Sequence, residues 1–85
     1  MTYEHKKLTP EQCRAARGLL GWSQTELAEA ASLSLPTIKR FETQNGVKVS
    51  SEAIDTMREA LELNGVLLIA ENGGGVGVRL RKRKK

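Results

Sequence analysis

Cysteine and histidine are almost absent from this chain. Its 85 residues include one cysteine, Cys13, and one histidine, His5. A single cysteine excludes a disulfide within the chain, and these two residues cannot supply the four ligands of a structural zinc site. No nucleophile–base pair can be drawn either, so we expect no enzyme activity, no metal and no cofactor. Cys13 falls within an apolar helical pattern, which predicts a small buried side chain.

Long hydrophobic runs are also lacking. The longest, VLLIA at 66–70, is far shorter than the roughly 20 residues that a membrane-spanning helix needs. The first residues, MTYEHKKL, are polar and are followed by no apolar segment, so no secretion signal is expected. With 39 % hydrophobic residues the composition is that of one small globular domain, for which we expect a cytoplasmic location and no membrane partner.

An excess of positive charge is missing from most of the chain, although the formal net charge is +4. Residues 79–85 hold six of the fourteen Lys and Arg side chains and no acid, which leaves eight basic against ten acidic side chains in the first 78 residues. That part therefore carries a net charge of −2. If the protein binds a polyanion, it must do so with a local basic face together with the tail.

Start and stop signals predict two helices in the first third of the chain. Thr9 caps the first helix, with Pro10 at its first position, and Gly21 ends it. The capping box Ser23-Gln24-Thr25-Glu26 then opens a short helix over 24–31.

Two further helices follow after a tight break at 32–34. Ser34 caps the third helix, with Pro36 in its first turn. The polar, Asn-Gly-containing stretch 43–49 is a loop. Ser50 or Ser51 caps the fourth helix, which runs to about Asn64 and is followed by Gly65.

The hydrophobic period changes after residue 65. Two β-prone runs, VLLIA and VGVRL, bracket the stretch ENGGG and predict a hairpin. The glycines lie between two strands with no helix after them, which excludes a dinucleotide-binding fingerprint. Because an isolated two-stranded ribbon is marginal in water, its apolar side must be covered, either by the helices of its own chain or by the hairpin of another copy.

The stretch 22–42, WSQTELAEAASLSLPTIKRFE, resembles the phage repressor/Cro-type (XRE-like) helix-turn-helix family. The matching positions carry the cadence Ser23, Gln24, Glu26, Leu27, Ala28, then Ala31, Leu33, Ser34, then Thr37, Ile38, Phe41, Glu42. Ser32 stands where the family often has a turn glycine, and serine adopts a left-handed backbone conformation less readily than glycine does.

The resemblance implies a mainly α fold, a four- to five-helix lambda-repressor-like DNA-binding domain, to which the sequence adds a C-terminal β-hairpin or strand. We accordingly divide the chain into a flexible N-terminus (1–8), a helix-turn-helix domain (9–64, motif at 23–42), a hairpin for dimerisation (65–80) and a basic tail (81–85). The tail is expected to add non-specific affinity for phosphate.

The same resemblance implies the roles of individual side chains. The third helix would enter the major groove and meet base edges through Leu35, Pro36, Thr37, Lys39 and Arg40. Contacts to the DNA backbone are expected from Ser23, Gln24, Thr25, Ser34, Thr43, Asn45 and Lys48. Arg17 and Glu42 match an ion pair that joins the first helix to the third. For dimerisation the hairpin offers Leu67, Leu68, Ile69, Val76, Val78 and Leu80.

The implied function is that of a DNA-binding transcriptional regulator of phage, plasmid or other mobile-element type. It would bind a palindromic operator as a homodimer in the nucleoid and repress its own promoter, whereas activation would need a contact with RNA polymerase. Two alternatives stay open. An antitoxin would bind its operator in the same way and mask a toxin, and a protein-interaction module would have lost DNA binding.

Overall fold

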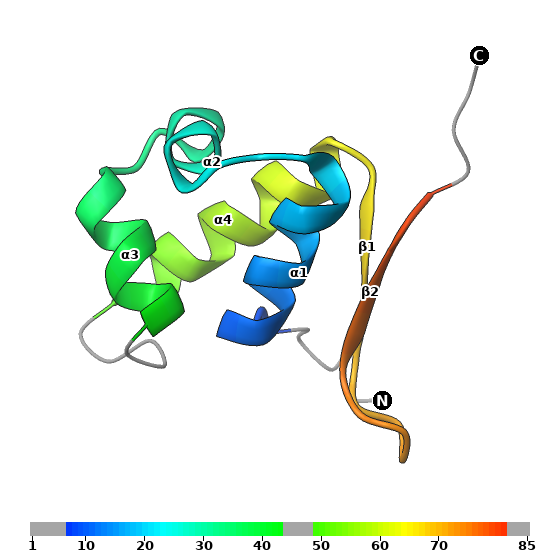
Figure 1. Ribbon diagram of the computed structural model, residues 1–85. Coiled ribbons are helices and arrows are strands. Elements are labelled where there is room, and N and C mark those ends of the chain that lie inside the picture. Colours follow the sequence, from blue (N-terminus) through cyan, green and yellow to red (C-terminus); the bar gives the residue numbers. More distant parts are fainter. Residues whose placement is uncertain (1–6, 44–48, 82–85) are drawn as a thin grey trace.

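The computed structural model describes residues 7–43 and 49–81, and the helices and strands of these ranges form one small body (Figure 1). They are α1 (Pro10–Leu20), α2 (Gln24–Ala31), α3 (Leu35–Thr43), α4 (Ser51–Leu63), β1 (Val66–Ile69) and β2 (Gly77–Leu80). The two strands pair antiparallel. The prediction of a mainly α domain with a C-terminal hairpin is therefore confirmed.

The predicted helix ends are present as local hydrogen bonds. The backbone N–H of Gln12 donates to Thr9 Oγ1 and the N–H of Thr9 donates to Gln12 Oε1, both at 3.0 Å. Ser23 and Glu26 form the second capping box at the start of α2. Gly21 closes α1 in a left-handed conformation (φ 70°), which costs glycine little.

The helices and the inner side of the hairpin share one hydrophobic core. Its largest fully buried side chains are Phe41, Leu27, Ile38, Met57, Leu61, Val66 and Cys13. Leu8 also lies in this core and is only 3 % exposed, so the boundary of the flexible N-terminus expected at residue 8 is wrong. Residues 1–6 lie outside the described ranges.

The inner side of the hairpin is covered by its own chain, which is one of the two alternatives that the sequence left open. β1 packs on α4, and both strands contact α1. Val66 is fully buried and Leu68 is 5 % exposed. The assignment of Leu68 to a dimer interface is therefore wrong, because this side chain fills the core of its own chain. Val78 and Leu80 are partly buried against the same core.

One polar side chain ties both strands to α1. Gln12 is 3 % exposed, and its Nε2 donates to the carbonyl oxygens of Ile69 (3.1 Å) and Gly77 (2.9 Å). These two residues face each other across the hairpin. Since Oε1 accepts the N–H of Thr9, the buried amide is fully satisfied. The same residue thus caps α1 and holds the hairpin in place.

The glycine-rich turn binds a carboxylate of its own. Glu71 Oε2 accepts the backbone N–H groups of Gly73 (2.9 Å) and Gly75 (3.1 Å). Both glycines have a positive φ, 101° and 91°, a conformation that other residues adopt at a cost. These N–H groups are thus engaged within the turn.

The start of the basic tail belongs to the packed structure. The backbone N–H of Arg81 donates to the oxygen of Gly65 at 2.7 Å, and its Nη2 donates to the oxygen of Glu62 at 3.1 Å. The predicted tail thus begins directly after β2, with a residue that is hydrogen-bonded to the body of the domain. Residues 82–85 lie outside the described ranges.

Candidate nucleic-acid interface

A tight turn places α3 across the end of α2. Ser32 ends α2 in a left-handed conformation, with φ 57° and ψ 41°, at the position where the resemblance calls for glycine. Ser34 Oγ then accepts the N–H of Thr37 at 3.2 Å and shares a hydrogen bond of 2.8 Å with Thr37 Oγ1. This cap starts α3. It also engages the hydroxyl of Thr37, which the sequence assigned to base contacts.

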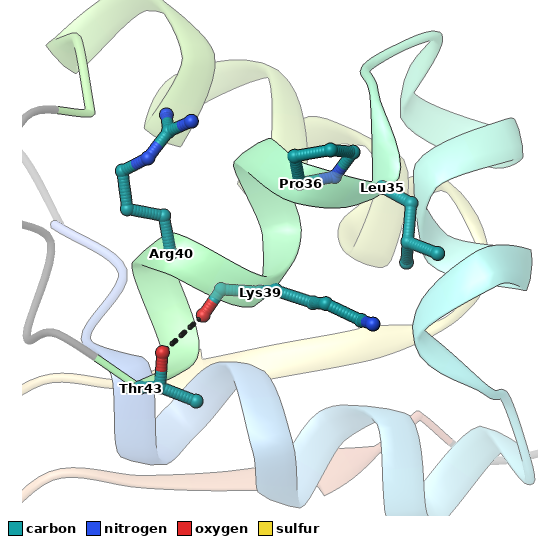
Figure 2. A pocket seen from close by; sticks show the side chains of 5 residues that line it. All are labelled: Leu35, Pro36, Lys39, Arg40 and Thr43. Atoms are coloured by element: carbon teal, nitrogen blue, oxygen red, sulfur yellow. Dashed lines mark hydrogen bonds between the residues drawn. The ribbon is translucent and has the colours of Figure 1, made fainter.

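α3 has one buried side and one uncovered side. Ile38, Phe41 and Glu42 point into the protein. The opposite side forms a shallow depression of about 350 Å³ (Figure 2), lined by Leu35, Pro36, Lys39, Arg40 and Thr43. The first turn of α3 contributes apolar side chains to this depression, and the second turn contributes basic ones. Four of the five residues predicted to contact bases thus share this surface, together with Thr43.

The two basic side chains of α3 extend in different directions in Figure 2, so that they reach over a wider surface than one cation would. Nearby, Thr43 Oγ1 donates to the carbonyl oxygen of Lys39 at 2.6 Å and is engaged within the helix. Arginine and lysine are the side chains that most often recognise guanine in the major groove.

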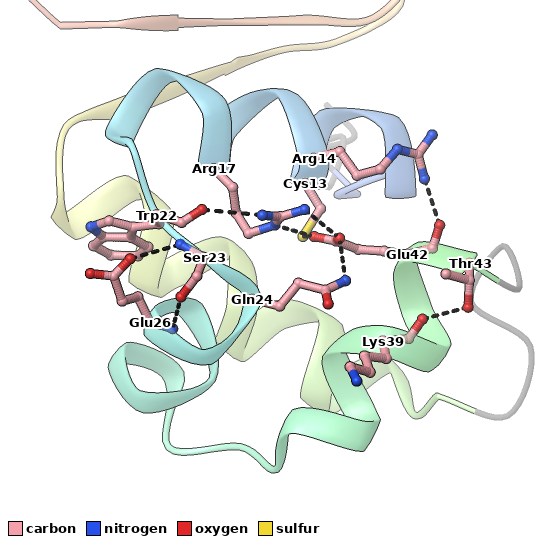
Figure 3. Close-up of polar contacts among 10 residues, drawn as sticks. All are labelled: Cys13, Arg14, Arg17, Trp22, Ser23, Gln24, Glu26, Lys39, Glu42 and Thr43. Carbon is pink, nitrogen blue, oxygen red and sulfur yellow. Dashed lines mark hydrogen bonds and ion pairs between the residues drawn. The ribbon is translucent and has the colours of Figure 1, made fainter.

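A buried carboxylate fixes α3 against α1 and α2 (Figure 3). The side chain of Glu42 is 1 % exposed and accepts two hydrogen bonds of 2.8 Å from Arg17. It also accepts a hydrogen bond from Cys13 Sγ at 3.0 Å and one from Gln24 Nε2 at 2.9 Å. The Arg17–Glu42 pair that the resemblance implies is present, within a larger network that the sequence reasoning missed.

The network sets the protonation of its members. Burial alone would raise the pKa of Glu42, but hydrogen bonds from Arg17, Cys13 and Gln24 and the charge of Arg17 outweigh it and hold this pKa below its ordinary value. Burial, followed by the hydrogen bond to Glu42, raises the pKa of the Cys13 thiol far above its ordinary value. Cys13 is therefore a neutral donor and not a reactive thiolate.

The start of α2 offers fewer free donors than the sequence suggested. The backbone N–H of Ser23 donates to Glu26 Oε1 at 2.7 Å, and Ser23 Oγ accepts the N–H of Glu26. Gln24 uses one of its side-chain donors on Glu42. The backbone N–H groups of Gln24 and Thr25, the second amide hydrogen of Gln24 and the hydroxyl groups of Ser23 and Thr25 can still donate to a phosphate.

Arg14 is a further residue that the sequence reasoning missed. Its Nη1 donates to the backbone oxygen of Glu42 at the C-terminal end of α3 (Figure 3). A signal existed, because Arg14 and Arg17 are three residues apart and so share one face of α1. Asn45 and Lys48, predicted to contact the DNA backbone, lie outside the described residues.

Within the described ranges, no helix is long and apolar enough to cross a lipid bilayer. The same ranges hold no group of three or more His, Cys, Asp or Glu side chains that could bind a metal ion.

Comparison with known proteins adds one match. Residues 14–66 fit the family model described as helix-turn-helix, a span that runs from α1 into the first residue of β1. No curated protein matches the chain. The matched span contains the whole network around Glu42 except Cys13, and all of α3.

Proposed function

We propose that this chain, which belongs to the XRE-like helix-turn-helix family of DNA-binding regulators, is a sequence-specific transcriptional repressor that inserts α3 into the major groove. The family is generally non-enzymatic. The observation that carries the proposal is the uncovered, basic surface of α3 within the matched span. An α-helix of this kind fits the width of the major groove.

The side chains on that surface suggest a division of roles. Arg40 has a planar guanidinium that can pair with two acceptors of one guanine, and Lys39 can reach guanine or a phosphate. Leu35 and Pro36 have no side-chain donors and suit the methyl group of thymine. The fixed network behind α3 supports these roles, because Glu42 leaves the helix little freedom to rotate.

A homodimer on a palindromic operator fits this mode of binding. One α3 reads only a few base pairs, whereas two copies related by a two-fold axis read half-sites about 34 Å apart. Such a repressor would work in the nucleoid and occupy its own promoter, and activation would require a contact with RNA polymerase. We propose an origin in a phage, plasmid or other mobile element, in line with the resemblance to phage repressors.

The outer side of the hairpin is the surface we propose for the dimer. Val76 is 42 % exposed, and Leu67 and Ile69 are half-buried on the side of β1 that faces away from the core. Truncating the hairpin would remove Val66 and Leu68 from the core, so point substitutions on the outer side are the better test.

The function is tested by selecting preferred sequences from random DNA and footprinting the protein on them and on its own upstream region. Arg40→Ala should weaken binding and relax the preference at one base position of each half-site by about 1–3 kcal/mol. Arg79→Ala, which removes an exposed arginine from β2, serves as the control and should leave the base preferences unchanged. Selection that yields no preferred sequence would sink the proposal.

A further inference from the structure

The cations of the helical part fall into two groups. Arg17 lies 2.8 Å from Glu42, and Arg58 lies within 4.0 Å of Asp55, Glu59 and Glu62 on its own helix. Lys7, Arg14, Lys39 and Arg40 have no acidic side chain within 4.0 Å among the described residues. Four positive charges of residues 7–43 and 49–63 are thus left uncompensated by near neighbours.

All four uncompensated cations lie on or beside α3. Lys39 and Arg40 belong to its uncovered side. Arg14 contacts its last turn, and Lys7 lines a depression with Phe41 of α3 and Val49, just before α4. Because the first 78 residues carry a net charge of −2, this grouping does not follow from a general excess of positive charge.

Arg14 has donors to spare at this position. Its guanidinium carries five N–H groups, and its hydrogen bond in the described part of the chain goes to the Glu42 carbonyl. The side chain of Glu42 is already taken by Arg17, Cys13 and Gln24, so it does not neutralise Arg14 directly. Arg14 is exposed, and its charge faces solvent at the end of the proposed recognition helix.

A helix in the major groove is flanked by the phosphates of both strands. The N-terminal end of α2 is suited to one of these backbones. With α3 in the groove, the C-terminal end of α3 would lie towards the other. We propose that Arg14 binds a phosphate of the DNA backbone beside the C-terminal end of α3, with Lys7 extending the same contact surface. This inference rests on the proposed function and adds α1 and the segment before it to the DNA-binding surface.

A bond to phosphate has a signature that a purely structural arginine lacks. Removing one cation that neutralises a phosphate makes the slope of log affinity against log salt concentration less negative by about 0.9. Arg14→Gln removes the charge and keeps an N–H donor for the Glu42 carbonyl. Between 50 and 200 mM salt, the ratio of wild-type to variant affinity should therefore shrink by about threefold, on operator and on unrelated DNA alike.

Two further variants decide between charge and structure. Arg58→Gln changes the net charge equally, at a site whose charge is compensated by acids, and should keep the wild-type slope. Arg14→Lys keeps the charge and should also keep that slope. A wild-type slope for Arg14→Gln, or an equal change for Arg14→Gln and Arg58→Gln, would overturn the inference. So would an Arg14→Lys slope as shallow as that of Arg14→Gln.

The slope is measured on unrelated DNA as well as on the preferred sequence, and thermal unfolding confirms that each variant is folded. If the wild-type protein prefers no sequence, the proposed repressor function fails. The slope comparison on unrelated DNA still tests the contact of Arg14, so the two failures are distinguishable.

Discussion

Ser32 holds the turn between α2 and α3 in a conformation that its side chain disfavours. Its φ of 57° is the one positive value for a residue other than glycine in the described ranges. The left-handed conformation costs an L-residue about 1–2 kcal/mol, whereas glycine adopts it freely. The turn is therefore strained at the point where the two helices of the motif meet.

Replacing Ser32 by glycine should stabilise the protein. Relief of the strain outweighs the greater freedom of glycine in the unfolded chain, which leaves a net gain of about 0.5–1 kcal/mol. Urea unfolding measures the change, and DNA affinity should stay within about twofold because the turn keeps its shape. A lower free energy of unfolding in the glycine variant would show that the serine side chain contributes an interaction that offsets its strain.

The buried carboxylate of Glu42 should make stability depend on pH in the acid range. Its pKa is lower in the folded protein than its ordinary value, so the folded state favours the charged form. The stabilisation is fully present above the unfolded pKa of about 4.3, and it is lost as the pH falls below that value towards the folded pKa. Urea unfolding between about pH 7 and pH 2.5 should show this loss.

Glu42→Gln is the control for that pH dependence. It leaves the positive charge of Arg17 without its partner and should cost about 3–5 kcal/mol at pH 7, because a largely buried ion pair is broken on one side. The difference in stability between wild type and variant should then narrow below about pH 4. A difference that stays constant over the whole acid range would mean that Glu42 does not titrate as described.

At the scale of residues, contacts between neighbours in the sequence were predictable, and contacts between residues far apart in the sequence were not. Both capping boxes follow from residues three positions apart, so the sequence alone reveals them. The second role of Gln12 depends on carbonyl groups 57 and 65 positions away. The sequence pattern does not single out Gln12 for such a contact, because any buried amide side chain near a strand end could make it.

At the scale of elements, the hairpin and α1 are coupled through one amide. Gln12 bonds the N–H of Thr9 and the carbonyls of both strands, at the end of the hairpin that bears the glycine turn. A two-stranded ribbon needs such support from the body to be stable. The attachment also keeps Val66 and Leu68 against the helices.

Gln12→Leu should therefore loosen the hairpin more than it loosens the helices. The variant loses the half of the capping box in which Gln12 accepts the N–H of Thr9, and it leaves two carbonyl groups without their donor, at a cost of about 2–4 kcal/mol. Hydrogen exchange of the backbone amides should show lower protection in β1 and β2 than in α3. Thr9→Ala is the matched control, because it removes the other half of the capping box, leaves the bonds to both strands in place and costs about 1 kcal/mol. Equal loss of protection in both variants would contradict the coupling.

The hairpin shows why strands can be predicted correctly from sequence while the surface that packs against them cannot. VLLIA and VGVRL predict two strands from their residue types alone. Which surface covers them depends on where α1 and α4 lie in space, and the pattern of 66–80 does not contain that information. The pattern therefore assigns Leu68 to the wrong interface, whereas the exposed Val76 remains available.

At the scale of the whole molecule, the outer side of the hairpin carries the dimer prediction. Leu67 lies opposite Arg79 in the sheet, so Leu67→Glu places a carboxylate beside an arginine and should fold normally. It should weaken the dimer at least about tenfold, because a charge replaces an apolar contact. Equilibrium sedimentation measures the change, with Arg79→Gln as a control for the charge of the opposite strand. A wild-type dimer in Leu67→Glu would place the interface elsewhere.

Positive charge is concentrated at the C-terminal end of the chain, where residues 79–85 hold six of the fourteen Lys and Arg side chains. Arg81 is bound to Gly65 and Glu62, so it should be kept when the tail is tested, and the basic residues to neutralise are 82–85. Replacing these four by glutamine keeps the length of the chain. If all four contact phosphates, the slope of log affinity against log salt should become less negative by about 3.6 on any DNA. Base preferences should stay the same, because the side chains that we propose for base contacts, Lys39 and Arg40, are unchanged. An unchanged slope would leave α3 and its surroundings as the whole DNA-binding surface.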